Sequence, residues 1–223
     1  AIKAYRRAAA TLQSIRPELL VKGRGRQVEF REAGGQVFFQ LADVILERAS
    51  AAKDSQTVQA YLHEAREAIE LFKASELRDY FKDNCVDAFT SRPTTLENVS
   101  HRAAVLYPII LPDRTELLLS FHDEIQRYIV RQKADVLIEE VRVFRRLVEK
   151  RSTRQYLPHA QQLYDWFIRP LESSLSAREI ETLVVVPDGA LRTIPFSALH
   201  DGRQFLIERY AVATTPGLNL TDP

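Results

Sequence analysis

Hydrophobic positions in the first 90 residues recur every three or four residues, which is the spacing of one face of a helix. This pattern predicts helices over residues 2–16 and 30–52. It predicts a third helix that starts at Asp54 or Ser55, either of which can cap it, and runs to about Asn84. Because the connectors between them are short, we expect the three helices to form an antiparallel array.

Several local features modify this helical pattern. Pro17 is expected to end the first helix, and Gly34 and Gly35 weaken the first turns of the second. Residues 22–26, KGRGR, are predicted to form a polar loop whose cations could bind phosphate, although the side chains of such a loop are usually only solvated. Residues 61–72 look like a degenerate tetratricopeptide (TPR) helix, but a clean repeat of about 34 residues is not found.

A polar stretch separates the helical part from the rest of the chain. Residues 91–100, SRPTTLENVS, contain few apolar side chains and one proline, as linkers do. We therefore expect a helical, TPR-like region over 1–90, a linker over 91–100 and a second domain over 101–223.

After the linker, the hydrophobic period shortens to that of strands. Residues 105–111 form an apolar run, in which Pro108 favours an edge position or a bulge. Residues 116–122 and 125–130 follow as two further strands, so the pattern predicts an antiparallel meander. The helical period then returns over 134–150.

The last third of the chain reads as helix and then buried strand. A helix is expected from about Pro158, with a kink or break near Pro170. Leu183–Val186 is a continuous apolar run, which is typical of a strand that is buried on both faces. A Pro-Asp-Gly turn over 187–189 ends it, and 205–212 is predicted as another strand. The predicted fold class is α/β, or α+β when the N-terminal helices are included.

Composition narrows the class of protein. The chain has 223 residues, of which 45% are hydrophobic and 27% charged, as in globular domains. A net charge of +1 argues against a nucleic-acid or anionic-membrane surface, and no apolar run is long enough to span a membrane. The single cysteine, Cys85, excludes an internal disulfide and fits a reducing, cytoplasmic compartment.

The amino-acid sequence of the C-terminal region resembles that of one protein family. The strongest matches are VVVPDGALRTIPFSALHDG, FLIERYAV and the TPGL that follows. Weaker ones lie upstream, in AIELFKASELRDYFKDNCV, VLYPIILPDRTELLLS and YLPHAQQLYDWFIRPLE. Together they make the sequence, from about Phe30 onward, similar to proteins with a CHAT domain, a caspase-like peptidase domain often found behind TPR repeats. The resemblance implies a caspase-like sheet covered by helices.

The same resemblance implies where catalysis would lie. In CHAT proteins the catalytic His sits in an alanine-threonine-histidine-glycine type motif, and the catalytic Cys follows in a serine-alanine-cysteine type motif. Both lie beyond the stretch that corresponds to Thr214–Leu220, and this sequence contains neither. We therefore expect the chain to be the front part of such a peptidase, without catalytic residues of its own.

The most suggestive polar group within the chain is the turn after the apolar run. Asp188 and Arg192 follow a predicted buried strand, and ligands of open α/β sheets gather at the carboxyl ends of strands. Arg192 could read an acidic side chain or a carboxylate of a substrate. The simpler interpretation is that Asp188 caps the turn and that Arg192 pairs with it or with a neighbour. We take both residues as candidates for substrate binding.

Other catalytic or metal chemistry has little support. Cys85 ends an apolar helical stretch, where a cysteine is usually a small core residue. The five histidines are scattered and form no metal-binding motif. Phosphate-binding and dinucleotide-binding loops are missing from the sequence, so no cofactor is expected.

Two functional classes remain. The first is the non-catalytic part of a CHAT-type cysteine endopeptidase, whose helical region binds a protein partner or regulates the enzyme and whose intact form cuts a peptide or protein substrate. The second is a protein-interaction scaffold in which the caspase-like half is a pseudo-peptidase. Nucleic-acid binding through 22–26 and the basic residues of 142–151 is the weakest alternative, because the charge of the chain is balanced.

Overall fold

The computed structural model describes residues 2–20, 24–81, 100–150 and 153–218. The chain divides into two compact units. One contains Ala1–Thr94 and Gly217–Pro223, and the other contains Thr95–Pro216. In the part of the chain that the structure describes, no helix combines the length and the apolar character needed to cross a bilayer.

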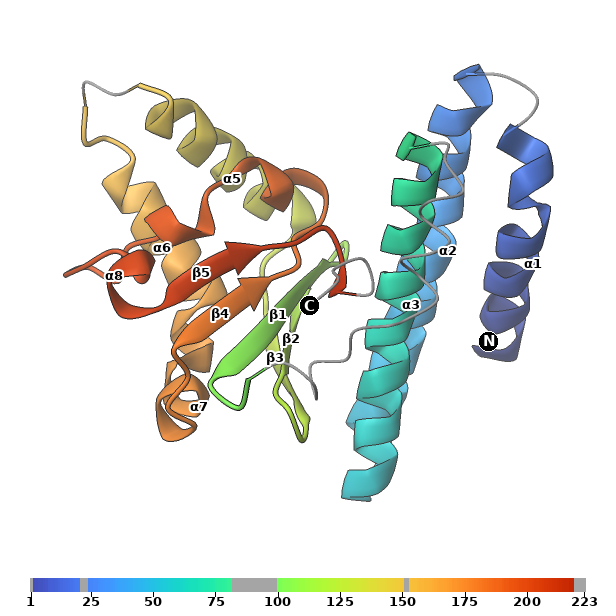
Figure 1. Cartoon of the computed structure of the whole chain (residues 1–223), viewed down its shortest axis with the longest axis horizontal. Helices are drawn as coiled ribbons and strands as arrows, with labels where there is room; N and C mark the ends of the chain where they lie inside the picture. The colour runs from blue at the N-terminus through green and yellow to red at the C-terminus, as the bar shows by residue number, and fades with distance from the viewer. Residues whose placement is uncertain (1, 21–23, 82–99, 151–152, 219–223) are drawn as a thin grey trace. The chain divides into compact units, whose positions relative to one another are not determined.

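Three helices form the first unit: α1 (Ile2–Leu20), α2 (Arg24–Ala51) and α3 (Ser55–Phe81). The helix α2 lies between the other two and contacts both (Figure 1). Two predicted boundaries were wrong. The first helix continues through Pro17 to Leu20. The second helix begins at Arg24 rather than near Phe30.

The start of α3 is capped as the sequence predicted. The Oδ2 atom of Asp54 accepts the backbone N–H of Thr57 at 2.8 Å and the Thr57 hydroxyl at 2.8 Å. These bonds satisfy a donor that a helix start leaves open. The Thr57 hydroxyl and backbone N–H together hold the pKa of Asp54 below its ordinary value.

Gly35 allows α2 and α3 to pack closely. A Cβ atom at this position would lie 2.9 Å from Cε2 and 3.2 Å from Cζ of Phe72. The Phe72 ring cannot easily move away, because its centroid lies 6.0 Å from that of Phe38 and 5.4 Å from that of Phe39. The glycine that weakens α2 as an isolated helix is therefore needed where the two helices meet.

We predict that Gly35→Ala lowers the free energy of unfolding by up to about 2 kcal/mol, because an overpacking cost of about 1–3 kcal/mol against Phe72 outweighs a helix-propensity gain of about 1 kcal/mol. Chemical denaturation measures the loss. Gln36→Ala, at an exposed neighbouring position, should change stability little. In a Phe72→Leu background Gly35→Ala should cost less, and an equal cost in both backgrounds would contradict this explanation.

The second unit is built on a mixed sheet of five strands in the order β3-β2-β1-β4-β5. They are β1 (Ala103–Ile110), β2 (Thr115–Ser120), β3 (Ile125–Val130), β4 (Thr182–Val185) and β5 (Ala211–Thr214). The strands β1, β2 and β3 form the predicted antiparallel meander, whereas β4 is parallel to both β1 and β5. The predicted fold class, α/β within an α+β chain, is confirmed.

The edge position predicted for the strand with Pro108 is wrong, since β1 pairs on both sides. Backbone groups of alternate strand residues point to the same side. The carbonyl of Leu106 accepts the N–H of Val186, so the backbone groups of Leu106 face β4. The backbone nitrogen of Pro108, two residues later, faces the same side. However, the last β1–β4 pair is Leu106–Val185, so Pro108 lies beyond the end of β4. Its missing N–H therefore removes no bond from the ladder.

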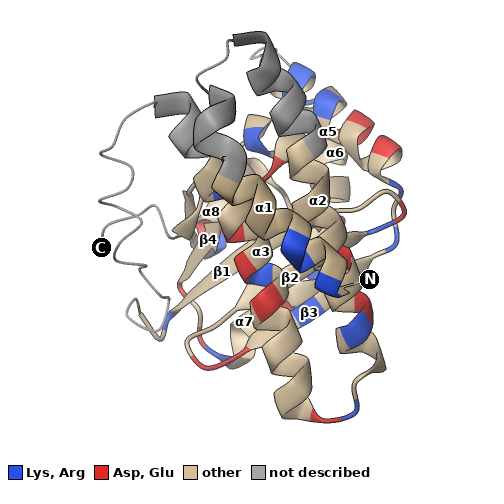
Figure 2. Cartoon of the chain, turned by 90° about the vertical axis from the view of Figure 1, so that its right-hand side faces the viewer, with Lys and Arg blue, Asp and Glu red and all other residues tan. Residues whose placement is uncertain are grey.

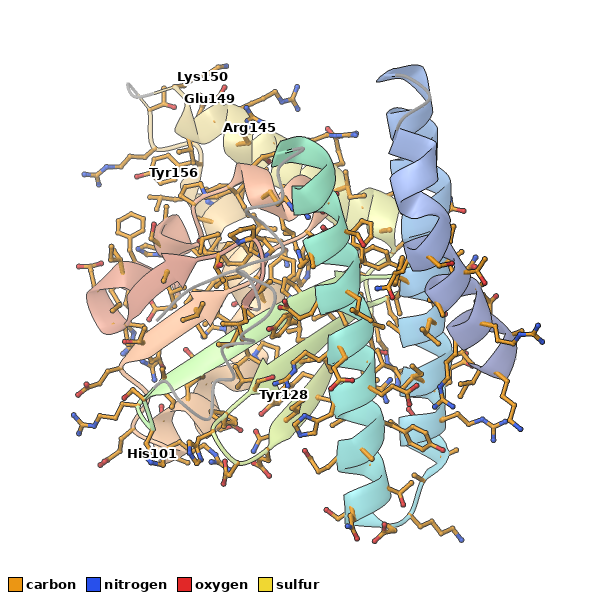
Figure 3. All side chains as sticks on the ribbon, turned by 45° about the vertical axis from the view of Figure 1, so that its right-hand side comes forward. His101, Tyr128, Arg145, Glu149, Lys150 and Tyr156 are labelled. Carbon is orange, nitrogen blue, oxygen red and sulfur yellow. The ribbon has the colours of Figure 1, made fainter. Side chains whose placement is uncertain are left out.

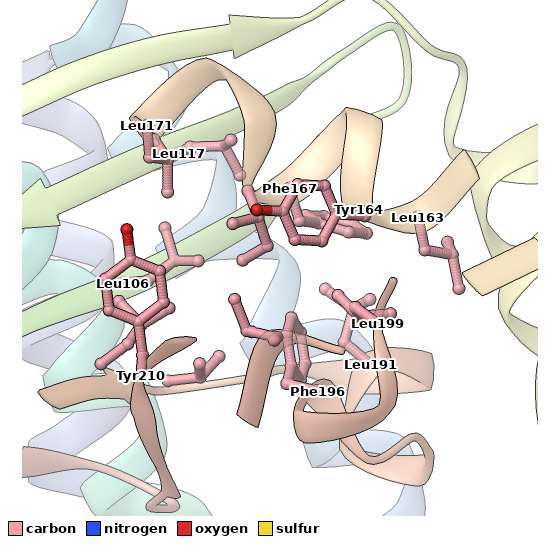
Figure 4. Packing of buried hydrophobic residues seen from close by; sticks show 14 of the residues in the cluster. Leu106, Leu117, Leu163, Tyr164, Phe167, Leu171, Leu191, Phe196, Leu199 and Tyr210 are labelled. Carbon is pink, nitrogen blue, oxygen red and sulfur yellow. The ribbon is translucent and has the colours of Figure 1, made fainter. Parts of the chain in front are cut away.

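Helices α5 (Ala134–Val148), α6 (Leu157–Phe167) and α7 (Glu172–Ala177) pack on one face of the sheet. As predicted, the helical path breaks at Pro170, in the short 3-10 turn η2 (Arg169–Leu171). The core between the layers contains Phe144, Leu183 and Val185. It also contains Leu106, Leu117, Leu163, Phe167, Leu191 and Phe196, which Figure 4 labels. Burial of these side chains holds the sheet and the helices together.

The strand predicted over 205–212 was only partly right. Its first half is the helical turn α8 (Leu206–Arg209), and only Ala211–Thr214 forms a strand. The carboxylate of Glu208 accepts the backbone N–H of Phe205 at 2.5 Å, which caps the turn. A glutamate three residues after the start of a turn stabilises helical geometry, and this outweighs the strand preference of the neighbouring apolar residues.

Candidate functional site

The site predicted from the sequence lies at the carboxyl edge of the sheet. Because β1, β4 and β5 are parallel, their carboxyl ends meet at one edge. The chain leaves β4 through Val186 and Pro187, which are buried, and turns at Gly189. Gly189 has a φ of +51°, a conformation that glycine adopts without strain. The turn then continues as the 3-10 helix η3 (Gly189–Thr193).

Asp188 and Arg192 are brought together at this edge. The Nη2 atom of Arg192 lies 2.6 Å from Oδ1 of Asp188, and Nε of Arg192 donates to the carbonyl of Pro187 at 3.4 Å. The Asp188 side chain is 16% exposed and the Arg192 side chain is 31% exposed. Leu191, between them in sequence, is fully buried in the core and anchors η3. The pair is therefore held on a fixed support with the guanidinium reaching solvent.

The geometry suits recognition of carboxylates. A guanidinium presents five N–H donors in a planar fork, which matches the two oxygens of a carboxylate. Asp188 already holds the fork in one orientation, so a second carboxylate would bind to a preorganised cation. The ion pair also agrees with the simpler interpretation, in which Asp188 and Arg192 only stabilise the turn. The capping by Asp188 that this interpretation included was wrong, because its side chain makes no capping hydrogen bond at the start of η3.

The segment between β4 and β5 is fixed by a polar network that the sequence analysis missed. Oε1 of Glu172 accepts the Tyr164 hydroxyl at 2.7 Å and Nη1 of Arg209 at 3.0 Å. Arg209 also donates to the Ser176 hydroxyl at 2.9 Å. Burial, followed by the hydrogen bond to Glu172, raises the pKa of Tyr164 well above its ordinary value, so the phenol stays a proton donor.

Asp201 closes the loop in the same segment. Its Oδ1 atom accepts the backbone N–H groups of Arg203 at 2.6 Å and Gln204 at 2.8 Å. The Asp201 carbonyl accepts Nη2 of Arg169, at 2.9 Å. Burial alone would raise the pKa of Asp201, but the bonds from Gln204 and Arg203 lower it more, so the pKa lies below its ordinary value.

Two of the histidines lie together, which the sequence analysis did not expect, and His159 and His200 lie apart from them. Nδ1 of His159 lies 2.6 Å from Oε1 of Glu140, and Nδ1 of His200 accepts the N–H of Gly202. The rings of His101 and His122 pack with their centroids 4.3 Å apart. Within the described residues, no group of three or more potential metal-binding side chains is found. Cys85 lies outside the described residues.

The basic residues of α5 are mixed with acidic ones (Figure 2). Arg142 and Arg146 lie 3.6 Å and 3.5 Å from the carboxylate of Glu139. Arg145 lies 3.1 Å from Glu149, close to Lys150 at the end of the helix (Figure 3). Of the predicted basic loop, residues 22–23 lie outside the described residues and the backbone of 24–26 belongs to α2.

Comparison with family models relates this architecture to a known domain. Residues 157–223 match the CHAT domain. The match starts at the first residue of α6 and contains α7, β4, η3 and β5, and thus both Asp188 and Arg192. It relates this segment to the caspase-like cysteine peptidases. A search of curated proteins found no match.

Within the segment that matches the CHAT domain, the sequence predicted the Asp188–Arg192 turn but not the polar contacts of the nearby residues. The i,i+4 spacing of Asp165 and Arg169, which lie 2.6 Å apart, could have been found from the sequence. The bond between Glu172 and Arg209 could not, because 37 residues separate them and no local pattern reports such a contact.

We predict that Asp201→Asn lowers the free energy of unfolding by about 0.5–1 kcal/mol at neutral pH, a modest value because the carboxylate is partly exposed and screened. The folded-state pKa is depressed, so the stabilisation by the charge is complete above the unfolded-state pKa, about 3.9. It is lost as the pH falls through the folded-state value.

Thermal unfolding of both proteins from pH 7 to pH 2 tests this. The difference in Tm should shrink below about pH 4. A difference that stays constant over the whole range would contradict a role for the charge of Asp201.

Proposed function

We propose that this chain is the front, non-catalytic part of a CHAT-type, caspase-like cysteine endopeptidase. Residues 101–223 would supply part of the peptidase domain and one wall of its substrate cleft. The helices of residues 1–90 would bind a protein partner or regulate the enzyme. The observation that carries the proposal is the Asp188–Arg192 turn, at the carboxyl end of an interior parallel strand and inside the CHAT match.

The position of the turn supports a role in substrate binding. In sheets with parallel strands, ligands bind at the carboxyl ends, where loops can vary without disturbing the core. Here the turn is anchored by buried Leu191, and its polar side chains reach solvent. A rigid support with exposed polar groups is what positions a substrate accurately.

The chemistry of the pair indicates the kind of peptide that this wall would accept. Arg192 would donate to an acidic side chain or to a terminal carboxylate of the substrate. Asp188 would keep the guanidinium oriented and would compete with the substrate for it. The wall would then favour acidic peptides and disfavour peptides with a basic residue at the same place.

Peptide cleavage needs a thiolate and a base close to it. Cys85 is the one cysteine in the sequence, and it lies before the segment that matches the CHAT domain. In the family, the catalytic His and Cys motifs follow the stretch corresponding to Thr214–Leu220. We therefore assign cleavage to a longer protein that carries those motifs, and substrate positioning to this chain.

An active-site-directed thiol probe tests the assignment. The chain of 223 residues should neither cleave a peptide library nor show labelling of Cys85 that depends on turnover, because it lacks the His and Cys motifs of the family. A longer form that carries those motifs should cleave peptides and be labelled at its own cysteine. Cys85→Ser in the longer form should leave cleavage unchanged and serves as the control.

Two results would count against the proposal. Turnover-dependent labelling of Cys85 would make this chain itself the enzyme. A longer form that lacks the His and Cys motifs, binds protein through its helices and cleaves nothing would support the scaffold with a pseudo-peptidase domain instead.

A further inference from the structure

The strand β5 is the last strand of the sheet, and one of its two sides is open (Figure 1). Within the described residues it pairs only with β4. Ala211, Ala213 and Thr214 are exposed to solvent. The unpaired edge of a strand is a template on which another extended chain can form hydrogen bonds.

The open edge of β5 carries none of the features that prevent such pairing. Charged side chains, prolines and bulges are the usual ones. The strand at the opposite end of the sheet, β3, contains the charged Arg127. In contrast, β5 contains no charged residue and no proline, and its register with β4 continues without a bulge. The sequence of β5 therefore permits pairing where the sequence of β3 discourages it.

The backbone groups that face the open side belong to Val212 and Thr214. The N–H of Ala211 donates to the carbonyl of Glu181 at 2.8 Å, so Ala211 faces β4. The N–H of Thr215, directly after β5, also donates to β4, at 3.0 Å. Because successive residues of a strand alternate in direction, Val212 and Thr214 face away from β4. Each of them offers one N–H donor and one carbonyl acceptor.

The open stretch is short, which limits what it can bind. The N–H of Tyr210 is already used, because it donates to the carbonyl of Leu206 in α8 at 3.0 Å. Pro216 has no N–H. Pairing is thus confined to Val212 and Thr214, which is far less than the interface of about 1,200 Å² that a stable complex of two proteins needs. A short extended peptide needs no more than such an edge.

An apolar side chain lies next to the amino end of this edge. Leu206 of α8 and Val212 of β5 both pack in the core on the face of the sheet that carries the helices. Ile207, which follows Leu206, is 60% exposed. A peptide residue opposite Val212 would place its side chain on the same face as Val212. Ile207 would therefore offer that side chain an apolar contact.

We propose that the open edge of β5 binds an extended peptide as an added strand. The peptide backbone would pair with Val212 and Thr214, and an apolar side chain of the peptide would contact Ile207. In antiparallel pairing each of the two residues exchanges both of its hydrogen bonds with the peptide, and the small Ala213 between them lets the two backbones approach. The role in substrate binding rests on the proposed function, to which it adds an extended substrate with apolar side chains at alternate positions.

A five-residue peptide tests the proposal on this chain, in a titration followed by NMR. The probe is Ser-Leu-Thr-Leu-Ser with acetylated and amidated ends, whose leucines would lie opposite Val212 and Thr214. The amides of these two residues should shift and saturate. N-methylation of both leucines should weaken binding at least about tenfold, because it removes the N–H groups that face β5. N-methylation of the central threonine, whose N–H faces away, should leave the affinity unchanged. Equal binding of the two methylated peptides would overturn the proposal.

A proline in β5 makes the same test from the side of the protein. Thr214→Pro removes an outward N–H and leaves those that pair with β4 in place. It should weaken binding about tenfold, whereas Thr214→Ala, which keeps the N–H, should bind like wild type. Ile207→Ala should weaken binding about threefold. Undiminished binding to Thr214→Pro would contradict an added strand.

Hydrogen exchange at Ala211 and Thr215 shows whether the pairing with β4 survives in Thr214→Pro. If the proline disturbs it, the methylated peptides decide the question on the wild-type chain. Shifts at Val212 and Thr214 that depend on protein concentration without peptide would mean that a second copy of the chain occupies the edge, and would overturn the peptide as its ligand.

The proposed peptidase and the added strand can fail separately, because peptide binding is measured without catalysis. Binding with the expected methylation pattern, together with a longer form that cleaves nothing, would leave the added strand standing and remove its role in substrate binding. A longer form that cleaves the probe equally well as wild type and as folded Thr214→Pro would overturn β5 as a substrate edge, while the peptidase stands.

Discussion

The burial of β4 between two parallel neighbours is the constraint on which the candidate site depends. Leu183 and Val185 are fully buried, and the strand pairs with β1 on one side and β5 on the other. Because both neighbours are parallel to β4, the chain leaves β4 at the edge where their carboxyl ends also lie. There Gly189 permits a sharp turn and Leu191 anchors η3 in the core. Asp188 and Arg192 owe their positions to this path.

Local pattern predicted much of this fold and the position of the site. The strand at the apolar run, the meander and the break at Pro170 were all predicted from neighbouring residues. The predicted burial of that strand on both faces was wrong, because Leu183 and Val185 are buried but Val184, on the opposite face, is only partly buried. The edge position predicted from Pro108 was wrong because the effect of this proline depends on where β4 ends, and β4 is far away in the sequence. The last β1–β4 pair is Leu106–Val185, so Pro108 lies beyond it. The turn at 206–209 was missed because the Glu208 cap outweighed the strand propensity of its neighbours.

The contacts that sequence reasoning could not find join residues that are far apart. Glu172 links α7 to Tyr164 and Arg209, and Glu70 holds Leu218. Gly35 likewise looked like a weak point of one helix until Phe72 of the next helix was placed against it. In each case the residue type is ordinary and its role comes entirely from a partner that tertiary structure supplies.

The most direct test of the account is to map where an acidic peptide binds, using backbone amide shifts in NMR spectra of this chain. A substrate wall at the carboxyl edge of the sheet predicts changes at 188–193 and around Thr215. Arg192→Ala should weaken the affinity about tenfold, whereas Arg203→Ala, at an exposed position of the next loop, should leave it unchanged. Changes confined to α1, α2 and α3, insensitive to Arg192→Ala, would contradict a substrate wall at the carboxyl edge of the sheet and favour an interaction scaffold.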